Sequence, residues 1–320
     1  MSSLKFVLLS CITGLTFGEN VYQPAECPGL YCGRQELGPG KYTSCGACPR
    51  GYQPLYNSIC NECTSSPTFY DWLYLGFMAI MSVLLHLYFI DYTNVRKQST
   101  TVLHISAIFE SVLAAVITLL LSDPMGTLTL RSCPVNRLED WYSMVKNPSP
   151  NYTTTYHCTQ EIVYPLYTIV MVYYAFSLLF MMCLRPFVSV KFVNCLGTKS
   201  IYAALYFLPI LIMVQAVLGG LLYYSFPYIM IIGSLITSAI HLATGLQQGF
   251  KDLLLDNVRN IRNLAILVGH WLLHSYGIIS LTELKEPEFH GPLLLLVFFP
   301  VLFYVFTSEF TNPENLDKVE

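Results

Sequence analysis

Six closely spaced cysteines near the N-terminus are the residues of this sequence best placed to do chemistry. They are Cys27, Cys32, Cys45, Cys48, Cys60 and Cys63. The pairs Cys45-x-x-Cys48 and Cys60-x-x-Cys63 have the spacing of a four-thiolate zinc site. Disulfides are the competing interpretation. A redox-active pair is a third, but such a pair normally begins a helix in a βαβ setting, and no such pattern surrounds these cysteines.

The start of the chain favours disulfides. After Lys5, an apolar run covers residues 6–15 and is followed by Thr16 and Gly18, so residues 1–18 read as a cleavable signal peptide rather than an N-terminal anchor. The secretory lumen is oxidising, and a segment rich in Gly and Pro cannot build an apolar core without covalent staples. We therefore predict a luminal cysteine-rich region over residues 19–69, with its connectivity open among fifteen possibilities.

A second luminal segment is predicted at residues 123–161. It holds Cys133 and Cys158, which we expect to pair and to stabilise the fold by about 3 kcal/mol through closure of their loop. It also holds the chain's only N-x-Ser/Thr sequon, at Asn151, which predicts glycosylation on the luminal side. Cys183 and Cys195, near a cytosolic helix end, are expected to be free thiols.

Polar residues within apolar runs are the remaining candidates, because charge in hydrocarbon is costly and often marks function. Glu110 is either a hydrogen-bonded pin between helices or the general base of an intramembrane zinc hydrolase. His270 and His274, four residues apart on one helix face, would then bind the metal, with His241 as third ligand. However, the 270–274 stretch lacks the Glu of H-E-x-x-H, and no Lys or Arg is expected near Glu110. We therefore favour structural roles and predict no catalytic residue, metal or cofactor.

Composition explains what must position these residues. Apolar residues make up 54% of the chain and charged residues 12%, about half the charged fraction of a soluble domain. We predict an all-α membrane protein with about seven transmembrane helices in a domain over residues 70–308 and a cytosolic tail over 309–320. The spans are expected near residues 72–90, 102–122, 162–184, 201–224, 228–246, 264–281 and 293–308.

The turn between the fourth and fifth spans is the weakest boundary. Ser225-Phe226-Pro227 is expected to form a tight luminal hairpin; if Pro227 only kinks a longer helix, the count falls to six. With a luminal N-terminus, the cytosolic loops hold eight Lys and Arg residues and the luminal connections four, a modest positive-inside bias. The net charge of −3 and the dispersed basic residues argue against a nucleic-acid partner.

A seven-helix receptor is a second functional class that fits the outline. The details fit it poorly, because the third span ends in Leu184-Arg185-Pro186 rather than an acidic-Arg-aromatic triplet. In addition, the connection at residues 225–227 offers no cysteine to pair with Cys158.

Several stretches closely resemble the c-Jun N-terminal kinase-associated membrane protein family. They are residues 70–79 (YDWLYLGFMA), 147–150 (NPSP), 157–159 (HCT), 164–170 (YPLYTIV), 200–207 (SIYAALYF), 219–224 (GGLLYY) and 270–274 (HWLLH). The resemblance implies a non-enzymatic, seven-span protein of the endoplasmic reticulum. It implies recruitment of proteasome subunits, ubiquitin ligases and other degradation factors to clear misfolded proteins, within the unfolded protein response and reticulum-associated degradation.

The resemblance also implies binding of a stress-activated kinase on the cytosolic side. Arg259 and Arg262, followed by Leu264 and Ile266, match a degenerate kinase-docking pattern. The two arginines are equally explained as positively charged flanks of a membrane span. The acidic tail over residues 309–320 suits a partner-binding peptide but specifies no partner.

Overall fold

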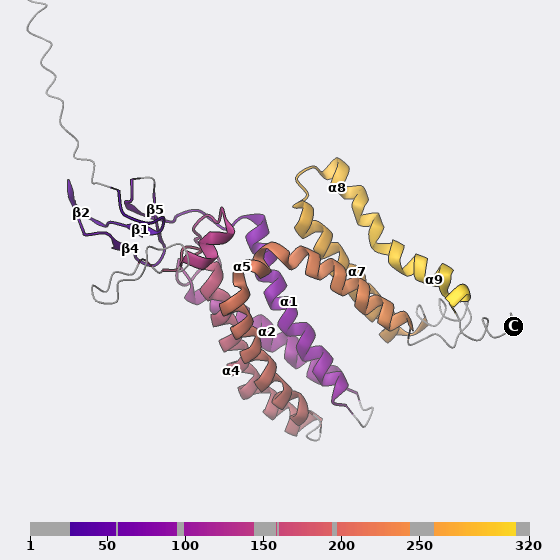
Figure 1. Cartoon of the computed structure of the whole chain (residues 1–320). Helices are drawn as coiled ribbons and strands as arrows, with labels where there is room; N and C mark the ends of the chain where they lie inside the picture. The colour runs from indigo at the N-terminus through magenta and orange to yellow at the C-terminus, as the bar shows by residue number, and fades with distance from the viewer. Residues whose placement is uncertain are drawn as a thin grey trace, which may run out of the picture. The chain divides into compact units, whose positions relative to one another are not determined.

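A computed structural model describes residues 26–55, 57–94, 99–143, 158, 160–193, 197–243 and 259–311. The chain divides into two compact units. The head unit comprises Met1–Glu62 and Ser143–Ile162, and the helical unit comprises Cys63–Tyr142 and Val163–Glu320. Figure 1 shows the short strands of the first and the long helices of the second.

The head unit is built from three two-stranded antiparallel sheets. The strands pair as β1 (Cys32–Gly33) with β4 (Gly46–Ala47), β2 (Glu36–Gly38) with β3 (Lys41–Tyr42), and β5 (Tyr52–Pro54) with β6 (Cys60–Glu62). Gly40 turns the β2–β3 hairpin with a φ of 73°, a conformation that favours glycine. Strands this short cannot hold a fold by pairing alone, so the cysteines supply the constraint.

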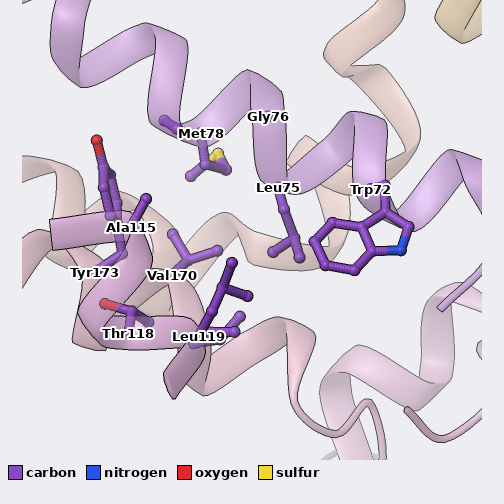
Figure 2. A pocket seen from close by; sticks show the side chains of 11 residues that line it. Trp72, Leu75, Gly76, Met78, Ala115, Thr118, Leu119, Val170 and Tyr173 are labelled. Carbon is purple, nitrogen blue, oxygen red and sulfur yellow. The ribbon is translucent and has the colours of Figure 1, made fainter. Parts of the chain in front are cut away.

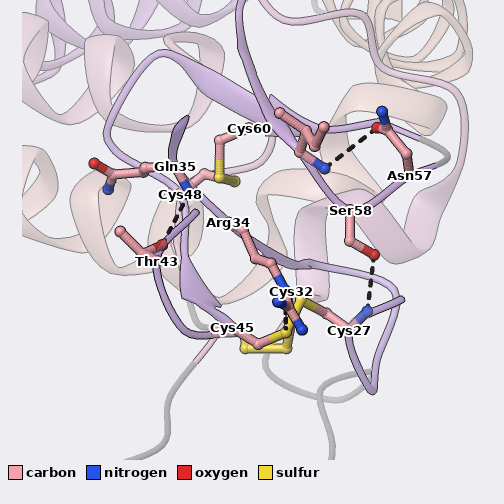
Figure 3. The surroundings of a disulfide bond; sticks show 12 residues. Cys27, Cys32, Arg34, Gln35, Thr43, Cys45, Cys48, Asn57, Ser58 and Cys60 are labelled. Atoms are coloured by element: carbon pink, nitrogen blue, oxygen red, sulfur yellow. Dashed lines mark hydrogen bonds between the residues drawn. A yellow bond between two sulfur atoms is a disulfide. The ribbon is translucent and has the colours of Figure 1, made fainter. Parts of the chain in front are cut away.

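Three disulfides lie within the head unit. Cys27 bonds Cys45, Cys48 bonds Cys60, and Cys32 bonds Cys158. Around the first of these, the Arg34 Nε–H donates to the Cys45 sulfur at 3.2 Å and the Cys27 amide donates to the Ser58 hydroxyl at 3.0 Å (Figure 3). A Cβ added to Gly33 would lie 2.5 Å from the Cys48 sulfur, so this position has no room for a side chain.

The predicted pair of Cys133 with Cys158 is wrong. Cys158 bonds Cys32 in the head unit, whereas Cys133 bonds Cys63 in the helical unit. The physical reason is that the 123–161 segment does not fold as one loop, because its first part belongs to the helical unit and its last part to the head unit. These disulfides bridge sequence separations of 126 and 70 residues, which in the chain-entropy model stabilises the fold by about 4–5 kcal/mol each.

The helical unit consists mainly of long apolar helices. They are α1 (Phe69–Tyr92), α2 (Thr101–Leu121), η1 (Leu138–Tyr142), α4 (Leu166–Phe192), α5 (Thr198–Ala243), α7 (Ile261–Thr282), α8 (Pro287–Leu293), η2 (Leu294–Phe298) and α9 (Phe299–Thr311). Among the described residues, six helical stretches are long and apolar enough to cross a membrane. The predicted class, a multi-pass helical protein with a disulfide-rich N-terminal region, is confirmed.

The hairpin expected at Ser225-Phe226-Pro227 is wrong, because α5 remains helical through these residues. Its 46 residues rise about 69 Å, more than twice the ~30 Å of a bilayer's hydrocarbon core. Figure 1 shows that α5 changes direction within its length. Before the bend, the Gln215 side-chain amide donates to the Tyr167 carbonyl of α4 at 3.3 Å. After the bend, the Ser234 hydroxyl lies 3.2 Å from Nδ1 of His274 in α7.

Pro227 explains the bend. Proline has no N–H, so it leaves the carbonyl four residues earlier, that of Tyr223, without its helical partner. The Tyr70 hydroxyl of α1 donates to this carbonyl at 2.8 Å. On the other side of the bend, Gly277 lets α7 approach closely, since an added Cβ would lie 3.1 Å from the Pro227 carbonyl oxygen.

The first turn of α1 is bonded to the same part of α5. Thr68 and Asp71 form a capping box, in which the Thr68 amide donates to the Asp71 carboxylate at 2.7 Å. The Tyr223 hydroxyl donates to the other oxygen of that carboxylate at 2.7 Å. Asp71 is only 5% exposed, so both hydrogen bonds compensate its removal from water.

Trp141 of η1 fills the space beside this junction. Its ring packs against Tyr74 and Tyr223, with ring centroids 5.8 and 5.1 Å apart. The close approach depends on Gly219 and Gly220 of α5, because a Cβ on Gly220 would lie 2.6 Å from the Cβ of Trp141. The Cys63–Cys133 disulfide and the Ser132 amide, which donates to the Ser65 carbonyl at 2.8 Å, bind the segment that leads to η1 to the segment before α1.

Gly220→Ala is expected to destabilise the helical unit by about 1–3 kcal/mol, because the added methyl group overlaps the Trp141 side chain. Gly233→Ala in the same helix is the matched control, since nothing lies within 4 Å of the added Cβ. Thermal unfolding in detergent should show a lower midpoint for the first variant only. Equal midpoints for both variants would show that Trp141 does not pack as described.

Candidate functional site

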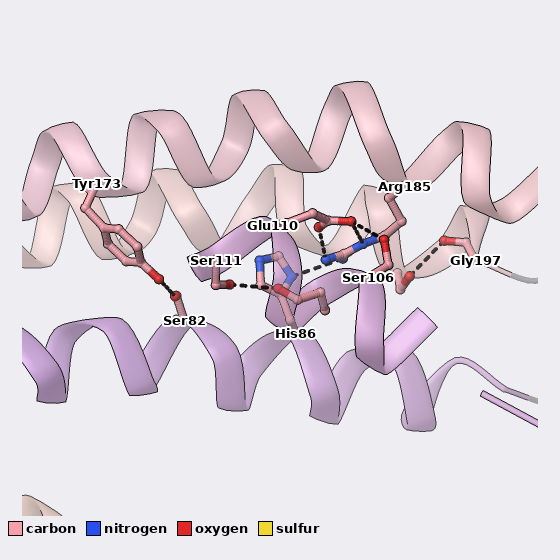
Figure 4. Close-up of polar contacts among 10 residues, drawn as sticks. Ser82, His86, Ser106, Glu110, Ser111, Tyr173, Arg185 and Gly197 are labelled. Atoms are coloured by element: carbon pink, nitrogen blue, oxygen red, sulfur yellow. Dashed lines mark hydrogen bonds and ion pairs between the residues drawn. The ribbon is translucent and has the colours of Figure 1, made fainter. Parts of the chain in front are cut away.

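Three polar side chains from three helices meet inside the helical unit. Glu110 of α2 and Arg185 of α4 are fully buried, and His86 of α1 is 1% exposed. Arg185 Nη2 lies 2.5 Å from Glu110 Oε2, and Arg185 Nε donates to Oε1 at 3.4 Å (Figure 4). The guanidinium and the carboxylate therefore face each other with two contacts, the arrangement in which Arg binds a carboxylate most strongly.

His86 completes the cluster. Arg185 Nη1 lies 3.0 Å from His86 Nδ1. A guanidinium can only donate, so Nδ1 must accept, and the imidazole is the neutral form with its proton on Nε2. Ser106 lies one helical turn before Glu110. Its hydroxyl donates to Glu110 Oε1 at 2.7 Å, which gives the carboxylate a further hydrogen bond besides those from Arg185. We call Glu110, Arg185, His86 and Ser106 the buried polar cluster.

The cluster was only partly predictable. Glu110 was identified, but the expectation that no Lys or Arg lies near it is wrong. Arg185 was placed in a cytosolic loop after a span ending at residue 184, whereas α4 continues through Pro186 to Phe192. The signal that would have found it is the apolar stretch after Pro186, Phe187-Val188-Ser189-Val190, which extends the span beyond the Arg-Pro pair.

The two histidines singled out in the sequence lie elsewhere. His274 Nδ1 is 3.2 Å from the Ser234 hydroxyl of α5, and the His270 ring lies 6.0 Å from the ring of His241. Within the described parts of the chain, no group of three His, Cys, Asp or Glu residues is arranged to hold a metal ion. Glu110 contacts Arg185 and Ser106 instead, so the described residues do not form the zinc-hydrolase arrangement.

The other predicted residues fall into two groups. Asn151 and Cys195 lie outside the described residues, while Cys183 is an exposed free thiol. The eight remaining candidates, Cys27, Cys32, Cys45, Cys48, Cys60, Cys63, Cys133 and Cys158, are joined in four disulfides.

The geometry of the buried polar cluster is that of a cross-link between α1, α2 and α4. Each charge of the ion pair is neutralised by the other, and the His86 acceptor binds the remaining face of the guanidinium. In an apolar surrounding such a pair holds its helices in one register, because sliding any of them would expose a charge to hydrocarbon. The described residues thus define a class: a multi-pass helical membrane protein with a disulfide-bonded head unit and an internal ion pair.

Comparison with known proteins gives the particular family. The family model described as JAMP, JNK1/MAPK8-associated membrane protein, matches residues 27–313. The JNK1/MAPK8-associated membrane proteins of Mus musculus and Homo sapiens are 52% and 51% identical to this chain over 303 residues, covering 92% of it and 96% of each relative. The homolog of Caenorhabditis elegans is 33% identical over 281 residues, 86% of both chains.

The chain therefore belongs to the JNK1/MAPK8-associated membrane protein family, as the sequence resemblance predicted. The names of these relatives describe a membrane protein associated with JNK1/MAPK8 and name no enzymatic activity. No solved structure matches the chain.

Removing one charge of the ion pair is expected to destabilise the helical unit more than removing both charges. Glu110→Gln leaves the Arg185 charge buried without its counter-ion and should destabilise the helical unit by about 3–5 kcal/mol. The double variant Glu110→Gln, Arg185→Met removes both charges and should recover much of that loss. Unfolding midpoints in detergent measure both effects.

Glu283→Gln provides the control, because the Glu283–Lys285 pair at 2.9 Å is exposed at Lys285 and should contribute little. The single variant Arg185→Met completes the comparison. If the destabilisation of the double variant equals the sum of those of Glu110→Gln and Arg185→Met, Glu110 and Arg185 act independently.

Proposed function

We propose that this protein is a non-catalytic membrane adaptor of the endoplasmic reticulum. In this proposal it binds a stress-activated kinase on the cytosolic side and recruits proteasome subunits and ubiquitin ligases to clear misfolded proteins. The observation that carries the proposal is family membership over nearly the whole chain, with relatives named for their association with JNK1/MAPK8. The buried polar cluster supports a structural rather than a catalytic use of the charged residues in the membrane.

The proposed topology has seven crossings, with the head unit in the lumen and the tail in the cytosol. Four disulfides favour an oxidising compartment for the head unit and for the segments that hold Cys63 and Cys133. The seventh crossing comes from α5, which is long enough to pass twice if the bend at Pro227 reverses it. The second part of α5 and α7 are antiparallel, as two consecutive crossings are, because Ser234 meets His274 whereas Ile231, earlier in α5, meets Gly277.

This topology places the partner-binding segments in the cytosol. They are the connection between α5 and α7 and the tail over residues 309–320. With Arg185 buried in the membrane, the cytosolic connections keep seven basic residues against four on the luminal side. Ile261, at the start of α7, is 83% exposed, so a partner can contact this end of the helix without disturbing its packing.

Topology can be tested at its two ends. In microsomes, Asn151→Gln should abolish a mass shift that endoglycosidase removes from the native chain, because the sequon is luminal in this proposal. A sequon added to the 309–320 tail should stay unmodified. Glycosylation of the tail would show that α5 crosses once and that the chain has six crossings.

Adaptor function can be tested by capture of the full-length protein from mildly solubilised reticulum membranes before and after misfolding stress. Kinase, proteasome subunits and ubiquitin ligases should rise with stress and fall in a variant lacking residues 312–320 or carrying Arg259→Ala and Arg262→Ala. Arg131→Ala and Arg137→Ala, on the luminal side in this topology, form the charge-matched control. Capture unaffected by the cytosolic changes, or free of these partners, would contradict the proposal.

A further inference from the structure

An apolar cavity of about 220 Å³ lies within the helical unit. Figure 2 shows it between α1 on one side and α2 and α4 on the other. Small side chains line it on two of these helices, Ala79 on α1 and Ala115 on α2. Trp72, Met78 and Tyr173 supply larger parts of the wall.

The cavity begins at one end of the helices. Trp72 and Ile169 lie three residues after the starts of α1 and α4, and Thr118 lies three residues before the end of α2. All three are therefore about 4.5 Å along the helix axis from the same end of the bundle, where Cys63 and Cys133 are joined. Ala79, ten residues into α1, marks the deep part about 15 Å along the axis.

Trp72 marks the membrane interface at this end. It is 38% exposed, and tryptophan prefers the headgroup level, where its ring is in an apolar region and its N–H meets water or lipid oxygens. The cavity therefore runs from the level of the lipid headgroups into the hydrocarbon of one leaflet. At this depth the medium around the helices is mainly the lipid of that leaflet.

The apolar walls favour an acyl chain. An engineered apolar cavity of ~150 Å³ stays dry and binds benzene, so the larger cavity in this protein has room for part of a hydrocarbon chain and no reason to hold water. Left empty, its wall would lose the dispersion contacts that packed interiors make, and packing rather than hydrophobicity drives association inside a bilayer.

One polar group in the cavity wall makes no hydrogen bond to the described residues. Thr118 is 2% exposed, and its hydroxyl has no hydrogen-bond partner among the residues that the structure describes. By contrast, the Tyr173 hydroxyl at the deep end is bonded to Ser82 at 2.8 Å. A buried hydroxyl without a partner costs about 1–3 kcal/mol. Thr118 is about as far from this end of the bundle as Trp72, so a Trp72 ring at the headgroup level places Thr118 near the ester carbonyls of the same leaflet.

We propose that the cavity binds one acyl chain of a glycerolipid from the leaflet at the Cys63–Cys133 end, and that the Thr118 hydroxyl donates to the ester carbonyl of that chain. The chain lies along Ala115, Val170 and Tyr173, and Trp72 packs at the entrance. This site is independent of the proposed adaptor function. It gives the membrane-spanning part of the protein a ligand-binding site, whereas the buried polar cluster in the same helices has a structural role.

Occupancy can be tested with phosphatidylcholine that carries a photoreactive diazirine midway along one acyl chain. In vesicles containing the full-length protein, irradiation should label the cavity wall, and Ala115→Phe should reduce that labelling to the background of the outer helix faces. Val116→Phe, at the neighbouring 37% exposed position, is the matched control and should leave it unchanged. Labelling spread over the outer faces, or unaffected by Ala115→Phe, would overturn the site.

The hydrogen bond is tested separately. An ether-linked photolipid lacks the carbonyl, so the native protein should favour the ester over the ether lipid by about fivefold, the value of one neutral hydrogen bond of ~1 kcal/mol. Thr118→Val keeps the shape of the side chain and should abolish this preference while cavity labelling persists. Equal labelling of the native protein by both lipids would overturn the role of Thr118.

Discussion

The Tyr70 hydroxyl donates to the Tyr223 carbonyl, which Pro227 deprives of its partner within α5. A buried carbonyl without a hydrogen bond is costly, so the bend depends on the donor that another helix supplies. The rest of the helical unit is arranged around this contact. The bend brings the second part of α5 to α7, and it keeps Tyr223 in reach of Asp71, whose capping box starts α1. Trp141 then packs against Tyr74 of α1, in a place where Gly220 leaves room for its side chain.

The same constraint accounts for the buried polar cluster. A lone Glu110 or a lone Arg185 would be too costly at membrane depth, whereas the pair, completed by His86 and Ser106, leaves both charges compensated. The result is that α1, α2 and α4 have a fixed register. This rigidity is consistent with the proposed adaptor role, in which segments outside the membrane bind partners. The Thr118 hydroxyl, which lies in the wall of the cavity, has no hydrogen-bond partner among the described residues, and this combination points to a ligand.

Particular residues show where sequence reasoning reached its limit. Hydropathy found the apolar segments and Glu110, because each depends only on local composition. Arg185 was misplaced because a charge next to a proline normally marks a helix end, and only its contact with Glu110, 75 positions away, reveals that α4 continues. Cys133 and Cys158 were paired because they are near in sequence, but disulfides join cysteines that are near in space, and the two lie in different units.

The sequence by itself determined the class of the protein, its family, the cysteine-rich region and the apolar composition of the helices, since these follow from residue types and their order. The tertiary structure decided the four disulfide partners, the continuity of α5 through Pro227, the ion pair of Glu110 with Arg185 and the cavity beside Thr118. Each of these depends on groups distant in the chain that meet only after folding, and in a bilayer such groups are held together because the surrounding hydrocarbon offers their charges and hydrogen-bonding atoms no other partner.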